Sequence, residues 1–174
     1  MAGQWRLVVL SSLVEGCTVS NYLIGIDPGC SGAIVVLQSA NIPEPVEWLR
    51  MPTLKEGKAN RVDCATLSKF LEDYDTGHAF VESVHAMPGN GATSMFAFGH
   101  AAGSVMGVLA AMHIPVTLVT PQAWKKSAGL IGSDKDGARS HAIRRWPRWG
   151  DLSAKGAGQA YADAALIALH GASA

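Results

Sequence analysis

Apolar positions along the chain gather into short runs that end in acidic residues and turns. Residues 22–27, with the sequence YLIGID, form an apolar run that closes on Asp27. A Pro-Gly turn follows, and apolar, largely β-branched residues return at 33–37. Short apolar runs bounded by turn residues are typical of buried strands. The pattern predicts a hairpin with the carboxylate of Asp27 at its mouth.

Asp27 admits two interpretations. Burying a carboxylate at a strand end costs free energy unless a metal ion, a phosphate-bound ion or a basic side chain satisfies it. Aspartate before Pro-Gly is also ordinary turn chemistry, in which the side chain only caps the turn. The stretch alone leaves both interpretations open.

The rest of the pattern predicts strands and helices in alternation. The two prolines before the third strand, Pro43 and Pro45, place that strand at a sheet edge. The expected elements are an edge strand at 46–51, a polar loop at 53–60, an amphipathic helix at 61–74, a strand at 78–83, a long helix at 92–113, a strand at 115–119, a helix at 136–145 and a closing helix at 158–170. This order predicts an α/β fold.

Two more acidic residues stand in apolar surroundings. Glu82 closes its strand as Asp27 closes the first, and strand ends at one sheet edge face the same crevice. Asp163 is a lone charge in an alanine-rich helix, where a buried carboxylate needs a partner. Gln159 lies four residues earlier, on the same helix face. Glu82 taken singly is also consistent with an ordinary surface or ion-paired residue.

Length and composition predict one domain. The chain has 174 residues, 48% of them hydrophobic, which suits one well-buried core. We expect this domain to span 21–174 and residues 1–20 to be a poorly ordered extension, because their apolar run is too short for a membrane helix and lacks a secretory pattern. The three cysteines are widely spaced, so they predict neither disulfides nor a zinc site and favour the cytoplasm.

Charge is balanced overall but uneven along the chain. Basic and acidic residues number 14 each, yet residues 120–150 carry seven basic side chains against two acidic ones, a local excess of five. This segment is either anion-facing or simply solvated. Its tryptophans, Trp124, Trp146 and Trp149, could stack on unpaired bases but are at least as often core residues.

The predicted helix at 92–113 is rich in glycine and alanine. Glycine is costly inside a helix, so its repetition indicates close backbone approach, either to the sheet or to a second subunit. Polar residues interrupt the segment and its flanks lack a membrane pattern, so we expect no membrane contact. The helix is the candidate contact of a homodimer.

Four ordered motifs resemble the RuvC-type Holliday-junction resolvases, in particular their phage-like branch. They are IGIDPG at 24–29 with the glycine and alanine at 32–33, VESV at 81–84, VTPQAWKK at 119–126 and ADAALIA at 162–168. The resemblance covers about residues 22–171. It implies a ribonuclease-H-like fold, a mixed five-stranded sheet flanked by helices, a homodimer, and cleavage of branched DNA such as a four-way junction.

The resemblance also implies a metal site. Asp27, Glu82 and Asp163 would hold two Mg²⁺ or Mn²⁺ ions for two-metal phosphodiester hydrolysis, with Asp27 bridging them. Family members usually carry a fourth acidic or metal-supporting residue shortly before the last aspartate, where this chain has Gln159, a neutral and weaker candidate ligand. The expected DNA contacts are Lys125, Lys126, Lys135, Arg139 and Lys155, with His85 as a further candidate.

Three other functions remain open from the sequence. A YqgF-like nuclease for structured RNA would share the acid-bearing first strand. A sugar-kinase or actin-like phosphotransferase opens with a similar hairpin but needs two such domains, and this chain has room for one. A non-catalytic junction-binding protein is the third alternative, because Gln159 replaces an acid.

Overall fold

A five-stranded mixed sheet forms the centre of the protein. The computed structural model describes residues 21–74, 77–83, 85, 89 and 91–173, and the predicted extension at 1–20 lies outside them. The strand order is β3-β2-β1-β6-β7; the neighbours β1 and β2, and β2 and β3, are antiparallel, whereas β1 and β6, and β6 and β7, are parallel. The strands are β1 (Tyr22–Asp27), β2 (Ala33–Gln38), β3 (Glu44–Arg50), β6 (His78–Glu82) and β7 (Val116–Val119). The predicted sheet and its edge strand are confirmed.

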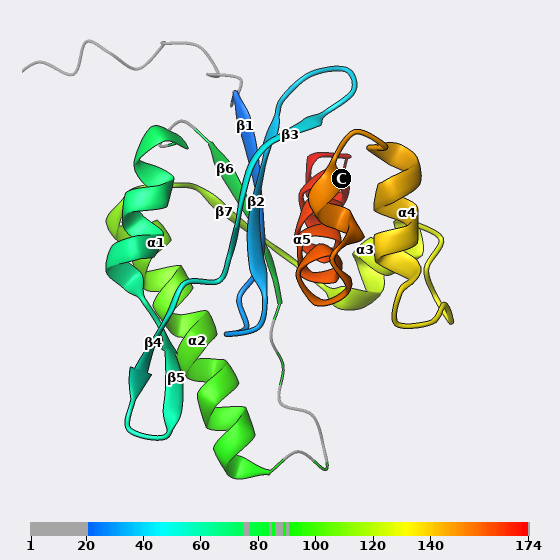
Figure 1. Cartoon of the computed structure of the whole chain (residues 1–174). Helices are drawn as coiled ribbons and strands as arrows, with labels where there is room; N and C mark the ends of the chain where they lie inside the picture. Colours follow the sequence, from blue (N-terminus) through cyan, green and yellow to red (C-terminus); the bar gives the residue numbers. More distant parts are fainter. Residues whose placement is uncertain (1–20, 75–76, 84, 86–88, 90, 174) are drawn as a thin grey trace, which may run out of the picture.

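Helices cover both faces of this sheet (Figure 1). On one face lie α1 (Cys64–Leu71), which continues into a short 3-10 turn at Glu72–Tyr74, and α2 (Ala92–Ala111). On the other lie α3 (Pro121–Ser127), α4 (Gly137–Arg145), a 3-10 turn at Gly150–Ser153 and α5 (Lys155–Ser173). Alternate residues of β1 and β2 point to opposite faces, so the apolar strands contribute to two separate cores.

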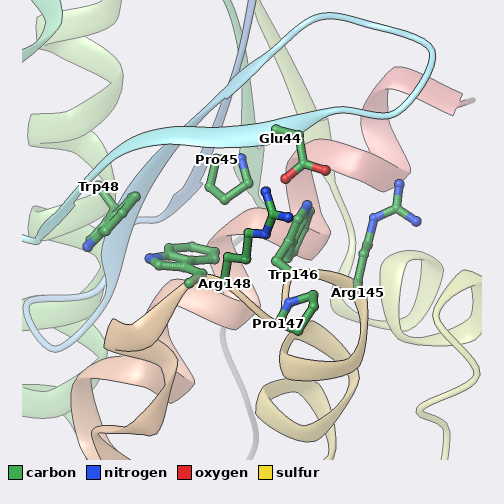
Figure 2. Close-up of a pocket in the computed structure, with 8 residues that line it drawn as sticks. Glu44, Pro45, Trp48, Arg145, Trp146, Pro147 and Arg148 are labelled. Atoms are coloured by element: carbon green, nitrogen blue, oxygen red, sulfur yellow. The ribbon is translucent and has the colours of Figure 1, made fainter.

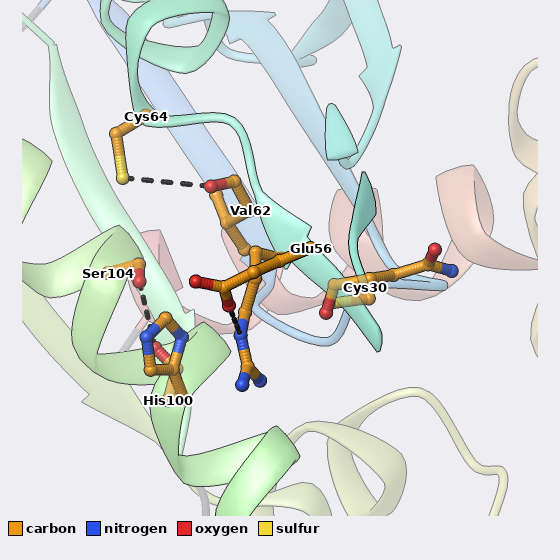
Figure 3. Close-up of polar contacts among 8 residues, drawn as sticks. Cys30, Glu56, Val62, Cys64, His100 and Ser104 are labelled. Atoms are coloured by element: carbon orange, nitrogen blue, oxygen red, sulfur yellow. Dashed lines mark hydrogen bonds and ion pairs between the residues drawn. The ribbon is translucent and has the colours of Figure 1, made fainter. Parts of the chain in front are cut away.

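The predicted polar loop at 53–60 is wrong, because the chain there forms a second, two-stranded sheet. Strands β4 (Thr53–Glu56) and β5 (Ala59–Val62) pair antiparallel around a two-residue turn. Gly57 provides that turn with a positive φ of 59°, which glycine adopts without strain. The Glu56 carboxylate (Figure 3) pairs with the Arg61 guanidinium at 2.7 Å. The same guanidinium lies over the ring of Phe96 on α2.

The helix predicted at 61–74 begins later than expected for the same reason. Arg61 and Val62 belong to β5, and α1 begins at Cys64. Asp63 caps this helix, since its carboxylate accepts hydrogen bonds from the backbone N–H groups of Ala65 and Thr66. The remaining predicted elements agree with the structure to within three residues at each end.

Helix α2 lies on the sheet with a minority of its residues buried. Its buried residues are Ala101, Val105, Val108 and Leu109, while Phe96 is 64% exposed. Among the described residues, α2 is the one helix whose length and apolar composition would allow it to cross a membrane. Core helices of soluble proteins meet the same two criteria. This is weak evidence, and the absence of membrane contact stays a prediction.

Close contact between β1 and α5 depends on Gly25. A Cβ atom at this position would lie 1.9 Å from the carbonyl oxygen of Ala164. We therefore expect Gly25→Ala to lower the free energy of unfolding by about 1–3 kcal/mol or more, since overpacking displaces neighbouring backbone. Urea denaturation measures this change.

Gly156→Ala on α5 is the matched control for Gly25→Ala. Among the described residues nothing lies within 4 Å of a Cβ atom built at Gly156, and alanine is favoured over glycine in a helix by up to about 1 kcal/mol. This variant should be as stable as the parent or more so. If Gly25→Ala unfolds at the same urea concentration as the parent, the close approach of α5 to β1 is not required.

Candidate active site at the carboxyl ends of β1 and β6

Three predicted acids meet at one edge of the sheet. Asp27 is the last residue of β1 and Glu82 the last of β6, and these strands are parallel neighbours with Ile26 opposite Val81. Parallel pairing therefore sets the two carboxylates side by side. Asp163 comes from α5, beside Ala164, whose backbone touches Gly25.

Electrostatics indicates that the three carboxylates interact. Burial is the main reason that the pKa of each is raised above its ordinary value. The charge of Asp27 raises the pKa of Glu82 further, and the charges of Asp27 and Glu82 both act on Asp163, whose pKa is raised to about 6. Half-buried carboxylates that repel one another favour a cation between them.

Each carboxylate is oriented by one uncharged donor. The backbone N–H of Gly29 donates to Asp27 Oδ1 at 3.2 Å, so Asp27 caps its turn as well as facing the other acids. The indole Nε1 of Trp124 donates to Glu82 Oε1 at 2.8 Å. The amide Nε2 of Gln159 donates to Asp163 Oδ1 at 3.0 Å.

Two basic side chains act on the same acids. The positive charge of Lys125 lowers the pKa of both Glu82 and Asp163, partly opposing the effect of burial. Arg50, at the end of β3, lowers the pKa of Asp27 in the same way. Its guanidinium also donates to the carbonyl oxygens of Ser31 and Gly32, which fixes it beside the turn of the β1–β2 hairpin.

The donor set fits a hard divalent cation. Carboxylate oxygens are the ligands that Mg²⁺ prefers, and the side chains that meet here offer oxygen rather than sulfur. The Oε1 atom of Gln159 is buried and has no hydrogen-bond partner among the described residues, so it is an acceptor left for a cation or a donor. Within the same residues no three Asp, Glu, His or Cys side chains are already close enough to hold an ion.

Two hollows flank the acids. Asp27 and Glu82 line a hollow of about 850 Å³ that is bounded by the β4–β5 hairpin and the start of α2. Asp163 and Gln159 line a second hollow of about 370 Å³, together with Lys125 and Lys135. The second hollow also holds Asp134, so its two lysines are balanced by two acids. A cation bound by the acids would leave these lysines free to attract an anionic chain.

Comparison with known proteins supports the fold. No family model and no curated protein matches the sequence. The structure is similar to RuvC of Thermus thermophilus, with a TM-score of 0.59, 19% identity, and coverage of 87% of this chain and 93% of that one. It is equally similar to T. thermophilus RuvC in complex with a Holliday junction substrate, with a TM-score of 0.59, 17% identity, and coverage of 87% and 92%. The fold is ribonuclease H-like.

The predicted DNA-contact residues occupy different positions on this ribonuclease H-like fold. Lys125, Lys126, Lys135 and Lys155 are exposed, and the first and third of these line the hollow of Asp163. Arg139 is largely buried and pairs with Asp136 at 3.4 Å. His85 is exposed and lies 3.5 Å from the Ser83 hydroxyl. Their roles in DNA binding stay predictions.

Four residues that contribute to the site were missed from the sequence. Trp124 was considered only as a core or stacking residue, although its indole holds Glu82. Arg50 and the β4–β5 residues Lys58 and Asn60, which line the larger hollow, were not considered as site residues. The available signal for Trp124 was its position shortly after β7, the strand that pairs with β6 and its terminal Glu82. Arg50, Lys58 and Asn60 reach the site through contacts between segments that are distant in the sequence.

Replacing Trp124 tests whether its hydrogen bond matters. Trp124→Phe retains a buried aromatic ring but removes the N–H that orients Glu82. We expect the affinity for Mn²⁺, measured by calorimetry, to fall by about 10–100-fold, as is typical when a partner of a metal ligand is lost.

The matched control is Trp146→Phe. Trp146 is as buried as Trp124, but its Nε1 donates to the carbonyl oxygen of Pro43, away from the acids. Trp146→Phe should leave the affinity for Mn²⁺ unchanged. Equal affinities for all three proteins would show that Trp124 only fills the core.

Proposed function

We propose that the chain is a metal-dependent endonuclease that nicks Holliday junctions or related branched DNA. The observation that carries this proposal is the gathering of Asp27, Glu82 and Asp163 from three elements at one sheet edge, where their charges interact. The similarity of the fold to T. thermophilus RuvC, one structure of which holds a Holliday junction substrate, supports the choice of substrate. The four sequence motifs favour the phage-like branch of such resolvases.

The chain's own groups would divide the work as follows. Asp27, Glu82 and Asp163 hold Mg²⁺ or Mn²⁺, two ions per site, with Gln159 as an additional neutral oxygen. When bound, the ions supply an activated water and stabilise the attacking and leaving oxygens of the phosphodiester. Trp124 and Gln159 keep the carboxylates in position, and Lys125 attracts the phosphate next to the scissile bond.

Basic side chains would align the DNA. Lys125 and Lys135 line the hollow of Asp163, and Lys126 and Lys155 are exposed, so phosphates that approach the acids would meet positive charge. His85 and Arg139 are secondary candidates. The reaction would take place in the cytoplasm of a bacterium or of a phage-infected host.

A homodimer through α2 suits this substrate. A four-way junction has two-fold symmetry, and two sites related by the same symmetry would nick opposed strands. Glycines 99, 103 and 107 lie every fourth residue along α2, and no described atom lies within 4 Å of a Cβ atom built at any of them. Phe96 and Phe98 are exposed. A second copy of the helix could cover this surface.

The test compares substrates and metals. Labelled four-way junction, matched duplex and structured RNA are each incubated with purified protein in Mg²⁺, in Mn²⁺ or in chelator. The proposal expects nicking of the junction with either metal and none with chelator. Preferential cleavage of the RNA would favour a YqgF-like activity, and a junction-selective gel shift without nicking would favour a non-catalytic binding protein.

A further inference from the structure

We propose that a separate pocket, at the opposite end of α4 from the acids, captures one unpaired base of the nucleic-acid strand. This aromatic pocket is a hollow of about 550 Å³ between the edge strand β3 and the segment that follows α4 (Figure 2). Its principal lining residues are Glu44, Pro45, Trp48, Arg145, Arg148 and Trp149. The proposal rests on the proposed function for the class of its ligand.

Tryptophans form the wall of the aromatic pocket. The rings of Trp48 and Trp149 lie 4.7 Å apart at 54°, and Trp146 packs edge-on against Trp149 at 5.8 Å. Trp48 is partly exposed, and its Nε1 donates to Asp151 Oδ2 at 2.7 Å. An aromatic face that is held in place before binding is a stacking platform for a planar base.

One donor in the pocket is unsatisfied. The Nε1 atoms of Trp48, Trp124 and Trp146 all have acceptors, but that of Trp149 is buried with no partner among the described residues. Leaving a buried donor unpaired is costly, so an occupant with an acceptor oxygen would be favoured there. Base carbonyl and phosphate oxygens are such acceptors.

The charge at the rim favours an anion. Arg145 and Arg148 are exposed, and neither forms an ion pair within the described part of the chain, while Glu44 is the one acid among the lining residues. Arg145 also lies over the ring of Trp146 at 5.4 Å. Arginine beside an aromatic platform suits a nucleotide, in which the base stacks and the phosphate pairs. A proline-rich peptide would use the rings but not the two cations.

Helix α4 connects the aromatic pocket to the acids. Ala138, near its start, lines the hollow of Asp163, and Arg145, at its end, lines the aromatic pocket. Seven residues of helix span about 10 Å, which is the rise of about three nucleotides of one strand. A strand that crosses the acids could therefore place a base a few nucleotides away in the aromatic pocket.

The test measures binding of fluorescent oligothymidylate, about 12 nucleotides long, by chains that carry Asp27→Asn to prevent cleavage. An oligonucleotide of equal length with abasic sites retains the phosphates but not the bases. We expect Trp48→Ala to weaken oligothymidylate binding about 10-fold and Trp48→Phe to weaken it less than about 3-fold. The abasic strand should bind the parent and Trp48→Ala equally weakly.

Two further variants separate rings from charges. Arg148→Gln should weaken the binding of both oligonucleotides by a similar factor, and Arg148→Lys should retain part of the affinity that Arg148→Gln loses. Val46→Ala, an exposed residue of the same strand outside the pocket lining, should change neither. Equal binding of thymidylate and abasic strands by the parent, unchanged binding by Trp48→Ala, or displacement of the oligonucleotide by polyproline would overturn the proposal.

Junction nicking by the chain without Asp27→Asn separates this proposal from the nuclease proposal. Trp48-dependent, base-dependent binding without metal-dependent nicking would contradict the nuclease and leave the pocket supported. Metal-dependent nicking together with base-independent binding would contradict the pocket and leave the nuclease supported.

Discussion

We expect Asp27→Asn and Glu82→Gln each to lower metal-dependent nicking of a four-way junction by at least about a hundred-fold. Loss of a residue that merely supports a metal ligand costs about 10–100-fold, and these carboxylates are themselves the proposed ligands. The amides replace an anionic oxygen with a neutral group of the same shape, so packing at the ends of β1 and β6 is preserved. Single-turnover nicking at saturating protein measures the chemical step.

Asp73→Asn serves as the control for these variants. Asp73 is an exposed acid in the 3-10 turn after α1, on the face of the sheet opposite α5. Asp73→Asn should nick the four-way junction at the parent rate. Because the amides remove negative charge, both site variants should still shift the junction in a gel. Parent rates in both site variants would exclude these carboxylates from catalysis.

We expect Asp163→Asn to raise the free energy of unfolding of the metal-free chain at pH 8 by up to about 3 kcal/mol. Burial, increased by the charges of Asp27 and Glu82, raises the pKa of Asp163 from 3.8 to about 6 in the folded chain. A carboxyl whose pKa is raised by folding destabilises the fold once it ionises. This destabilisation is absent below pH 3.8, the pKa of Asp163 in the unfolded chain. It grows as the pH rises from there to the pKa of about 6 in the folded chain, and is fully present at higher pH.

Urea denaturation in chelator at two pH values measures this effect. The variant should be more stable than the parent at pH 8, and the difference should shrink towards pH 4. Added Mn²⁺ should stabilise the parent more than the variant, because the variant keeps only Asp27 and Glu82 as charged ligands and the amide has already removed the repulsion at Asp163. If Asp163→Asn destabilises the metal-free chain at pH 8, the carboxylate is satisfied without a cation.

The fold and the three acids were accessible from the sequence for a local reason. The apolar runs around Asp27 and Glu82 end abruptly in a charge, and parallel pairing then carries both ends to the same edge. The shared helix face of Gln159 and Asp163 follows from four-residue spacing, and their 3.0 Å hydrogen bond confirms it. These features depend on short stretches of chain.

The parts that the sequence did not reveal depend on distant segments. The β4–β5 hairpin is too polar to appear as strands, because all four residues of β4 are exposed and its pairing is a matter of backbone geometry at Gly57. The bond from Trp124 to Glu82 joins residues 42 positions apart. No local pattern distinguishes a tryptophan that holds a carboxylate from one that only fills a core.

The claim that Asp27, Glu82 and Asp163 form one metal site is tested most directly by diffraction from crystals soaked in Mn²⁺. Data collected at the manganese absorption edge locate the ions without reference to the protein density. The account predicts anomalous peaks between the three carboxylates, and their loss in Asp27→Asn crystals. Crystals that show no manganese there, or manganese bound only at other acids such as Asp73, would contradict it.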